Sequence, residues 1–231
     1  MIGVLSDAHG NICAFRQAVK LLTRLGANKF YFLGDSVGYI PTTEVLRELY
    51  CMGDTVKCIK GNHEVELLDG SLDSPLDDIY QHQRVRNELT ADLVAFIRSW
   101  PNEIMEEQMG TRILFVHGGP SNHINQYVYY DTDLSLYSMR EDYMFMGHTH
   151  YPFIRQVGAT VFVNVGSCGL PRDDGRFGSA ALFNPIDRMV KIIRFSIEQE
   201  IQTAFSDYGP VHPMVMALRQ RRSSDIIGEL V

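Results

Sequence analysis

Short, largely apolar runs recur along the first two thirds of the chain, and each of them stops at a small or polar residue. Runs of this length, bounded by glycine and polar residues, are typical of buried strands. We therefore predict five strands, at residues 1–5, 29–33, 55–60, 111–116 and 143–146.

Apolar residues at helical spacing separate the first three of these strands. One stripe runs from Ile12 to Leu25 and is followed by Gly26, and a second opens at Thr42 or Thr43 and ends near Gly53. Asn11 is a suitable N-cap for the first helix, and glycine is typical just past a helix end. Helices between successive strands imply that these strands pair in parallel.

The rest of the chain has two helical regions and further short strands. Residues 64–101 favour a helical excursion, with a loop at Ser71–Pro75, and residues 197–231 favour a C-terminal helical segment. Residues 120–140 indicate a loop with a short helix. The β-type runs at 153–157, 160–165, 179–184 and 189–195 favour an antiparallel second sheet. We interpret residues 1–231 as a single α/β domain.

Composition excludes several classes of protein. Of the 231 residues, 45% are hydrophobic and 21% are charged, which is typical of a globular domain and excludes collagen, coiled coil and overall disorder. The net charge of −7 argues against a dedicated nucleic-acid binder. No apolar stretch reaches membrane-spanning length, and the first strand begins at Met1, so we expect a cytoplasmic protein without a signal peptide. The sequence carries no signal for an oligomeric state.

Side chains of metal-ligand type follow each of the five strands. Five of the eight histidines are among them. Because the carboxyl ends of parallel strands line one crevice, we expect these side chains to converge. The residues are Asp7, His9, Asp35, Asn62, His63, His117, His148 and His150.

The spacing of these residues suggests how they are oriented. Asp7 and His9 lie two apart, so on extended backbone they point the same way, towards one metal ion. By the same reasoning, His63 points away from its neighbour Asn62, which leaves it free to face a substrate.

Seven of the eight residues can serve two ions if Asp35 bridges them. One ion would then be held by Asp7, His9, Asp35 and His150, and the other by Asp35, Asn62, His117 and His148. Two ions at such a spacing are suited to in-line displacement at phosphorus. Mixed nitrogen and oxygen ligands favour manganese, iron, zinc, nickel or cobalt over magnesium or calcium.

The five strand-end stretches resemble the five blocks of the calcineurin-like metallophosphoesterase superfamily, in the same order. The amino-acid sequence of residues 33–39 and 164–173 is similar to that of small bacterial and archaeal predicted phosphodiesterases of this superfamily. The resemblance implies a four-layer α/β/β/α sandwich, with two mixed β-sheets flanked by helices, and the metal assignments given above.

This resemblance also implies a dinuclear phosphodiesterase that acts on a small phosphate-ester substrate. A hydroxide bridging the two metals would attack phosphorus in line, and His63 would be the general acid for the leaving oxygen. Alternatives are a phosphomonoesterase or protein phosphatase, a hydrolase of dinucleoside polyphosphates, and a non-enzymatic scaffold.

The chain departs from the family pattern after Gly34 and Asp35. Serine/threonine protein phosphatases carry a further Asp-Arg-Gly there, whereas this chain continues with residues 36–40, Ser-Val-Gly-Tyr-Ile. Arg172 could replace the missing arginine as a substrate ligand, or it could form an ion pair with Asp173 or Asp174. Without that arginine, the site would bind the doubly charged phosphoryl group of a monoester weakly, which favours a diester as the substrate. The 64–100 excursion and the tyrosines of residues 127–137 could wall a cleft for its second substituent.

The remaining histidines and Cys168 are not assigned to the metal site. His82 lies in a polar stretch and His212 between prolines, so both are expected to face solvent. His123 is expected on a surface loop, and Cys168 is expected to be a small packing residue.

Overall fold

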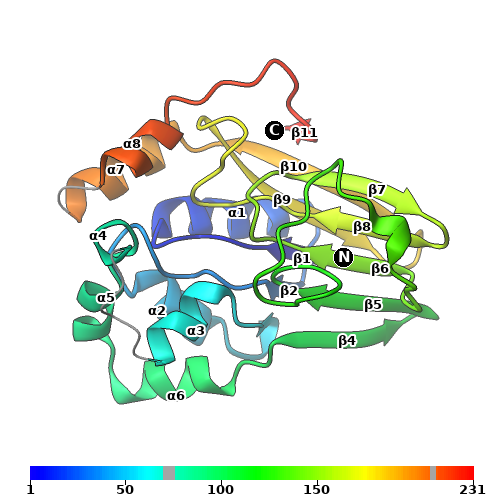
Figure 1. Ribbon diagram of the computed structural model, residues 1–231, viewed down its shortest axis with the longest axis horizontal. Coiled ribbons are helices and arrows are strands. Elements are labelled where there is room, and N and C mark those ends of the chain that lie inside the picture. The colour runs from blue at the N-terminus through cyan, green and yellow to red at the C-terminus, as the bar shows by residue number, and fades with distance from the viewer. Residues whose placement is uncertain (70–75, 209–211) are drawn as a thin grey trace.

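The computed structural model describes residues 1–69, 76–208 and 212–231. Two mixed β-sheets pack face to face and are flanked by helices, which confirms the predicted architecture (Figure 1). The predicted loop at Ser71–Pro75, and residues 209–211 of the predicted C-terminal helical segment, lie outside the described residues.

The first sheet has six strands among the described residues, in the order β11-β10-β9-β1-β2-β3. β1, β2 and β3 pair in parallel, and β9 pairs antiparallel with β1. Their bounds are β1 Ile2–Leu5, β2 Lys29–Phe32, β3 Val56–Cys58, β9 Phe177–Asn184, β10 Met189–Ser196 and β11 Glu229–Leu230.

The second sheet has five strands within the described ranges, in the order β4-β5-β6-β8-β7. β5, β6 and β8 are parallel to one another, and the outer strands β4 and β7 are antiparallel to their neighbours. The bounds are β4 Glu103–Gln108, β5 Thr111–Val116, β6 Tyr143–Met146, β7 Phe153–Val157 and β8 Thr160–Asn164.

The prediction that the four later runs form an antiparallel second sheet is wrong. β7 and β8 join β6 in the second sheet, whereas β9 and β10 join the first sheet beside β1. β9 lies there because Ala181 and Phe183 supply its apolar inner face. β4 was not predicted, since its residues alternate between exposed and half-buried and four of its six are polar.

Helices cover the outer face of the first sheet, and their apolar sides form one core with it. Asn11 caps the first helix as predicted, its side chain accepting from the backbone N–H of Ala14. A loop with the 3₁₀ turn η2 (Leu134–Leu136) covers the outer face of the second sheet. The helices are α1 Ile12–Arg24, α2 Glu44–Met52, α3 Asn62–Asp69, α4 Asp77–Tyr80, α5 His82–Glu88, α6 Ala91–Ser99, α7 Glu198–Asp207 and α8 Pro213–Leu218, with a 3₁₀ turn η1 at Gly53–Thr55.

Aromatic packing joins the two sheets. The rings of Tyr31 and Phe115 stack across the interface, with centroids 3.9 Å apart and planes 5° from parallel. Phe145 extends this contact at 5.3 Å from Phe115. Such contacts fix the relative position of the sheets. The loops that follow the carboxyl ends of β1, β2, β3, β5 and β6 consequently meet one another.

Candidate metal centre

All eight predicted site residues meet where these five strands end. Seven of them are buried, with exposed fractions of 5% or less, and Asn62 is half-buried. Backbone hydrogen bonds tie the loops together: the N–H of Asp7 donates to Gly34 and the N–H of His9 donates to Asp35. The first two strand ends are thereby fixed against each other before any side chain is considered.

The backbone at these positions is not extended, so the predicted reason for the alignment of Asp7 and His9 is wrong. Both residues have left-handed backbone, with φ of 56° and 49°. Asp35, His148 and His150 share this conformation, with φ of 58°, 65° and 62°. Asp and His tolerate positive φ better than most residues but still carry strain, and strain of this kind clusters at functional sites.

The segment after β3 also differs from expectation. Asn62 and His63 are the first two residues of α3, so helical backbone, not extended backbone, separates their side chains. Glu64, in the same turn, is fully buried and accepts hydrogen bonds from the backbone N–H groups of Asp35, Ser36 and Gly61 and from the Ser36 hydroxyl. Glu64 therefore holds the second and third strand ends together.

One group of ligand atoms surrounds Asp7. His9 and His150 each donate from Nδ1 to a backbone carbonyl, of Val37 and Leu170 respectively. A carbonyl can only accept, so Nε2 of each neutral ring carries a lone pair. These two Nε2 atoms lie only 3.0 Å apart, and His150 Nε2 lies 3.1 Å from Asp7 Oδ1. Three electron-pair donors thus face one another with no hydrogen between them in the neutral state.

A second group surrounds His117. Its Nδ1 donates to the Leu33 carbonyl over 2.7 Å, which again leaves a lone pair on Nε2. That atom lies 3.1 Å from His148 Nδ1, 3.2 Å from Asn62 Oδ1 and 3.3 Å from Asp35 Oδ2. Asp35 Oδ2 is also 3.9 Å from Nε2 of His9, so Asp35 stands between the two groups.

The pKa values show how burial and the neighbouring side chains act on these donors. Burial alone raises the pKa of Asp7 and Asp35, but the neighbouring histidines outweigh burial and lower both. Burial lowers the pKa of His117, yet the Asp35 carboxylate raises it to about 9. Burial also lowers the pKa of His148 to about 4 and of His150 to about 3. The Asp35 carboxylate therefore favours a proton on His117, whereas burial favours the neutral rings of His148 and His150.

The chemistry of these residues fits bound cations. Asp7 Oδ1 and His148 Nε2 are buried without a hydrogen-bond partner in the described chain, and the Nε2 atoms of His9, His150 and His117 all point inwards. A histidine that ligates a metal normally donates its other N–H to a carbonyl or carboxylate, as three of these rings do. Ligand atoms of Asp7, His9 and His150 lie close enough together to hold one ion, and so do those of Asp35, His117 and His148.

His63 has a partner that sequence reasoning missed. Its Nδ1 lies 2.8 Å from Nε2 of His82, and its Nε2 lies 3.9 Å from Asp35 Oδ2. The prediction that His82 faces solvent is wrong, because His82 is only 5% exposed. The Nδ1 atom of His82 lies 3.7 Å from Glu66 Oε2, one helical turn beyond His63. His82 therefore fixes the orientation of the His63 ring.

Arg172 faces the site and forms neither of the ion pairs considered for it. Asp173 pairs with Arg194 and Asp174 pairs with Arg176. The Arg172 guanidinium donates instead to the hydroxyl of Tyr39 over 2.8 Å. After burial, its charge is the largest influence that lowers the pKa of His150, so it acts directly on the metal centre. His123, as expected, lies on a loop, beside Glu103.

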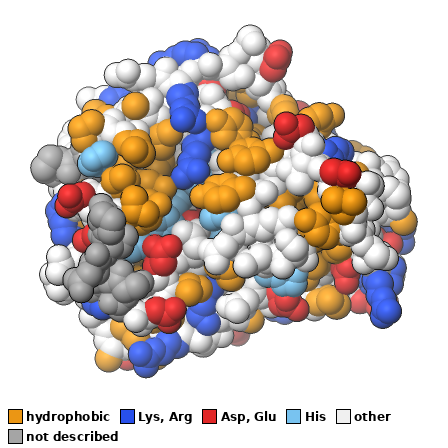
Figure 2. Space-filling view, viewed as in Figure 1, with side chains coloured by type: hydrophobic (Ala, Val, Ile, Leu, Met, Phe, Trp, Pro, Cys, Tyr) orange, Lys and Arg blue, Asp and Glu red, His pale blue; other side chains and the backbone are white. Residues whose placement is uncertain are grey.

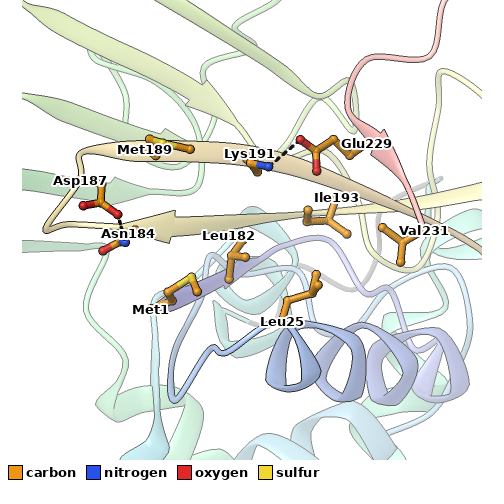
Figure 3. A pocket seen from close by; sticks show the side chains of 10 residues that line it. All are labelled: Met1, Leu25, Leu182, Asn184, Asp187, Met189, Lys191, Ile193, Glu229 and Val231. Atoms are coloured by element: carbon orange, nitrogen blue, oxygen red, sulfur yellow. Dashed lines mark hydrogen bonds and ion pairs between the residues drawn. The ribbon is translucent and has the colours of Figure 1, made fainter.

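Two cavities differ in their relation to this centre. One of about 460 Å³ is lined by Tyr39 and Arg172 and opens beside the histidines. The other, of about 290 Å³, lies at the amino end of β1, between Met1 and β9 to β11, and its lining is largely apolar (Figure 3). The second cavity is therefore at the opposite end of the sheet from the ligands. No helix within the described ranges has the length and apolarity needed to cross a bilayer.

Comparison with known proteins identifies the family. The sequence profile of the calcineurin-like phosphoesterase superfamily domain matches residues 1–186. An uncharacterized protein of Methanocaldococcus jannaschii is 28% identical, over 89% of this chain and 90% of its own. A metallophosphoesterase from Sphaerobacter thermophilus has the same fold, with a TM-score of 0.78 and 23% identity over 94% of this chain and 98% of its own.

A hypothetical protein from Pyrococcus horikoshii also shares the fold, with a TM-score of 0.75 and 19% identity over 95% of this chain and 98% of its own. With a profile match over most of its length, the chain belongs to the calcineurin-like phosphoesterase superfamily. It is a metal-dependent hydrolase of phosphoric esters.

Proposed function

We propose that the protein is a phosphodiesterase that uses two transition-metal ions and acts on a small phosphate ester. The observation that supports this best is the packing of ligand-type atoms: the lone pairs of His9 and His150 face each other beside the Asp7 carboxylate, and Nε2 of His117 lies beside the Asp35 carboxylate. Neutral donors packed this closely repel one another unless a cation lies among them. His9, His150 and His117 are therefore arranged to bind cations rather than to act as acids or bases.

The proposed ligands are those given above, with Asp35 shared between two ions of manganese, iron, zinc, nickel or cobalt. Bound there, the ions would lower the pKa of a water molecule and neutralise charge on the phosphoryl oxygens. The chain's own part is to orient these ligands. Asp7 also accepts from the backbone N–H of His148 over 3.0 Å, and Asp35 from that of His63, so each carboxylate is fixed in place.

His63 is the proposed general acid. The hydrogen bond between its Nδ1 and His82 leaves Nε2 on the side of the metal centre, where a leaving oxygen would sit. Burial holds the pKa of the free ring well below its usual range. The negative charge of a bound phosphate ester opposes this effect and favours the protonated ring that a general acid requires.

A diester is the favoured substrate because of the 460 Å³ cavity beside the centre. A monoester needs only a grip on its doubly charged phosphoryl group, whereas a diester needs room for a second substituent. The cavity provides that room and is lined by aromatic rings, among them Tyr39, Tyr127 and Tyr151. It is far larger than a phosphoryl group alone would use.

The test is a matched pair of substrates with the same chromophore. Purified protein is loaded with each metal in turn, its metal content is measured, and kcat/KM is compared for bis(p-nitrophenyl) phosphate and p-nitrophenyl phosphate. We expect two ions per chain and a higher value for the diester. Absence of both metal and turnover would instead indicate a non-enzymatic scaffold.

One observation favours a second candidate, a phosphomonoesterase. Arg172 has no carboxylate partner in the described chain and acts electrostatically on His150, as a phosphate-binding arginine would. A preference for the monoester that is lost in Arg172→Ala would identify Arg172 as the phosphate-binding arginine. The protein would then be a phosphomonoesterase rather than a phosphodiesterase.

A further inference from the structure

The cavity beside the metal centre combines aromatic rings with positive charge. Its tyrosines come from four separate loops and helices, namely Tyr39, Tyr80, Tyr127, Tyr129 and Tyr151. Two arginines, Arg172 and Arg221, complete the polar part of the wall. On the face shown in Figure 2, basic side chains run between groups of hydrophobic ones, and histidine is visible at their lower end.

The aromatic rings continue directly from the metal ligands. The Tyr127 ring lies 4.0 Å from the His148 ring, measured between centroids, and the Tyr39 ring lies 4.7 Å from that of His9. Tyr129 then follows Tyr127, with centroids 6.2 Å apart and planes only 11° from parallel. Tyr127 and Tyr129 remain 50% and 40% exposed, so their faces are open to a flat ligand. A ring of the substrate could stack there while its phosphate lies at the centre.

The two arginines face the same cavity, and neither is neutralised. Arg221 donates from Nη1 to the Tyr151 hydroxyl and to the backbone carbonyl of Arg172, both over 2.9 Å. Arg172 donates to a tyrosine hydroxyl. In the described chain, no carboxylate lies within ion-pair distance of either. A guanidinium has five N–H donors, so both retain donors for an anion.

Arg221 belongs to a different part of the chain from Arg172. It follows α8, beyond residues 1–186 that match the family profile. α8 is held over the cavity by Val215 and Leu218, which pack with Tyr39 and Leu170. The backbone N–H of Gly175 donates to the carbonyl of Arg221 over 3.1 Å, which fastens the segment after α8 to the loop that carries Arg172.

We infer that this cavity binds a nucleotide that carries a second phosphate of its own, so that the substrate class is a nucleotide diester with a phosphate besides the scissile one. This rests on the proposed function. The base stacks on Tyr127 and Tyr129, Arg172 contacts the scissile phosphate, and Arg221 contacts the second phosphate. The volume of about 460 Å³ suits one nucleotide unit rather than a long strand.

Three p-nitrophenyl diesters with the same leaving group test the inference. They are bis(p-nitrophenyl) phosphate, thymidine 5′-(p-nitrophenyl phosphate), and the latter with an added 3′-phosphate. We expect kcat/KM to rise at each step, by about tenfold for the 3′-phosphate, as expected for one partly exposed charge-assisted hydrogen bond. Equal values for the two thymidine esters would overturn the role of the second phosphate. No hydrolysis of any diester would instead contradict the proposed function.

Two pairs of variants locate the effect. In Arg221→Gln the advantage of the 3′-phosphate should disappear, whereas it should persist in Arg222→Gln, whose side chain bonds to backbone carbonyls outside the cavity. In Tyr129→Leu the advantage of thymidine over p-nitrophenyl should fall, but not in Tyr130→Leu, because Tyr130 packs on Phe153 instead.

Thermal unfolding of each variant checks that it is folded. If a variant does not fold, the comparison of the three substrates with the wild-type enzyme still tests the inference. An Arg221→Gln enzyme that keeps the full 3′-phosphate advantage would show that this arginine does not bind the second phosphate.

Discussion

Two acidic clusters near opposite ends of β2 contrast a structural site with a functional one. Near the amino end, Glu106 of β4 accepts hydrogen bonds from Lys29, Tyr31, Lys57 and Gln108. Hydrogen-bond donors surround its negative charge, so the carboxylate needs no additional cation. Beyond the carboxyl end, Asp35 is surrounded mainly by histidine nitrogens, whose lone pairs oppose one another.

The pKa values express the same contrast. Burial alone raises the pKa of Glu106, but hydrogen bonds from Lys57 and Tyr31 lower it to about 2, so the carboxylate is stable as it stands. Burial lowers the pKa of His117, but the Asp35 carboxylate beside it raises that pKa to about 9. An ionic cluster is thus structural when its own side chains neutralise it, and a binding site when they do not.

The largest difference should appear when each carboxylate is converted to its amide. In Asp35→Asn, the amide cannot bridge two cations, so we expect fewer than two metals per chain and a loss of kcat of about 10³-fold, or roughly 4 kcal/mol. In Glu106→Gln, kcat should stay within about twofold of wild type. Elemental analysis and turnover of bis(p-nitrophenyl) phosphate measure both. Two metals and intact activity in Asp35→Asn would refute the assignment.

The next effect concerns His63, which acts on the leaving group and not on the metals. His63→Ala should retain its metals and lose about 10²- to 10³-fold in kcat with alkyl leaving groups. The loss should be smaller with p-nitrophenolate, which needs little protonation. A series of diesters with leaving groups of increasing pKa measures this slope. A uniform loss across the series would show that His63 is not the general acid.

A smaller effect is expected at His82, which positions His63. His82→Ala removes the 2.8 Å contact with Nδ1, so kcat should fall about tenfold while the metals remain bound, and His82→Gln should recover part of the loss. As in His63→Ala, the loss of kcat should be larger for leaving groups with a higher pKa. His123→Ala is the control, because His123 contacts Glu103 on a loop. A loss in His82→Ala that is independent of the leaving group would indicate a purely structural role.

The smallest effect is on the stability of the fold and concerns the cluster around Glu106. The folded pKa of Glu106 is about 2 and its ordinary value is 4.5, so its stabilisation is present above pH 4.5 and is lost as the pH falls towards 2. Because Lys29 and Lys57 are partly exposed, we expect Glu106→Gln to cost about 1–2 kcal/mol at pH 7. Urea unfolding at several pH values measures the difference, which should shrink below pH 4.5. A constant difference would contradict this origin.

The sequence was informative about the metal centre because the relevant signal is local. Each ligand type directly follows an apolar run, and parallel strands bring their carboxyl ends together whatever the loops between them do. Position in the chain was therefore enough to predict that Asp7 and His150 converge, although 143 positions separate them. The backbone of these residues was misjudged, because the left-handed conformation of Asp7 and His9 has no sequence signature outside glycine.

Features that depend on long-range packing were missed. His82 lies among polar residues, and its burial arises only because α5 packs beside α3. β9 and β10 look like an ordinary hairpin, and nothing local shows that they extend the first sheet beside β1. β4 carries charged residues on an edge of the second sheet, so its composition resembled that of a loop.

The five left-handed residues of the metal centre also set a limit on how this protein can be improved. Each costs of the order of 1–2 kcal/mol relative to glycine, and the surrounding core must supply that free energy. Replacing these residues with glycine would relieve the strain but would also remove buried side chains that hold the strand ends together, as Asp7 does through the His148 N–H and Asp35 through the His63 N–H, so a directed-evolution screen for heat resistance has little to gain at these positions. Selection on phosphate-ester turnover would keep all five and could raise the melting temperature only elsewhere in the fold.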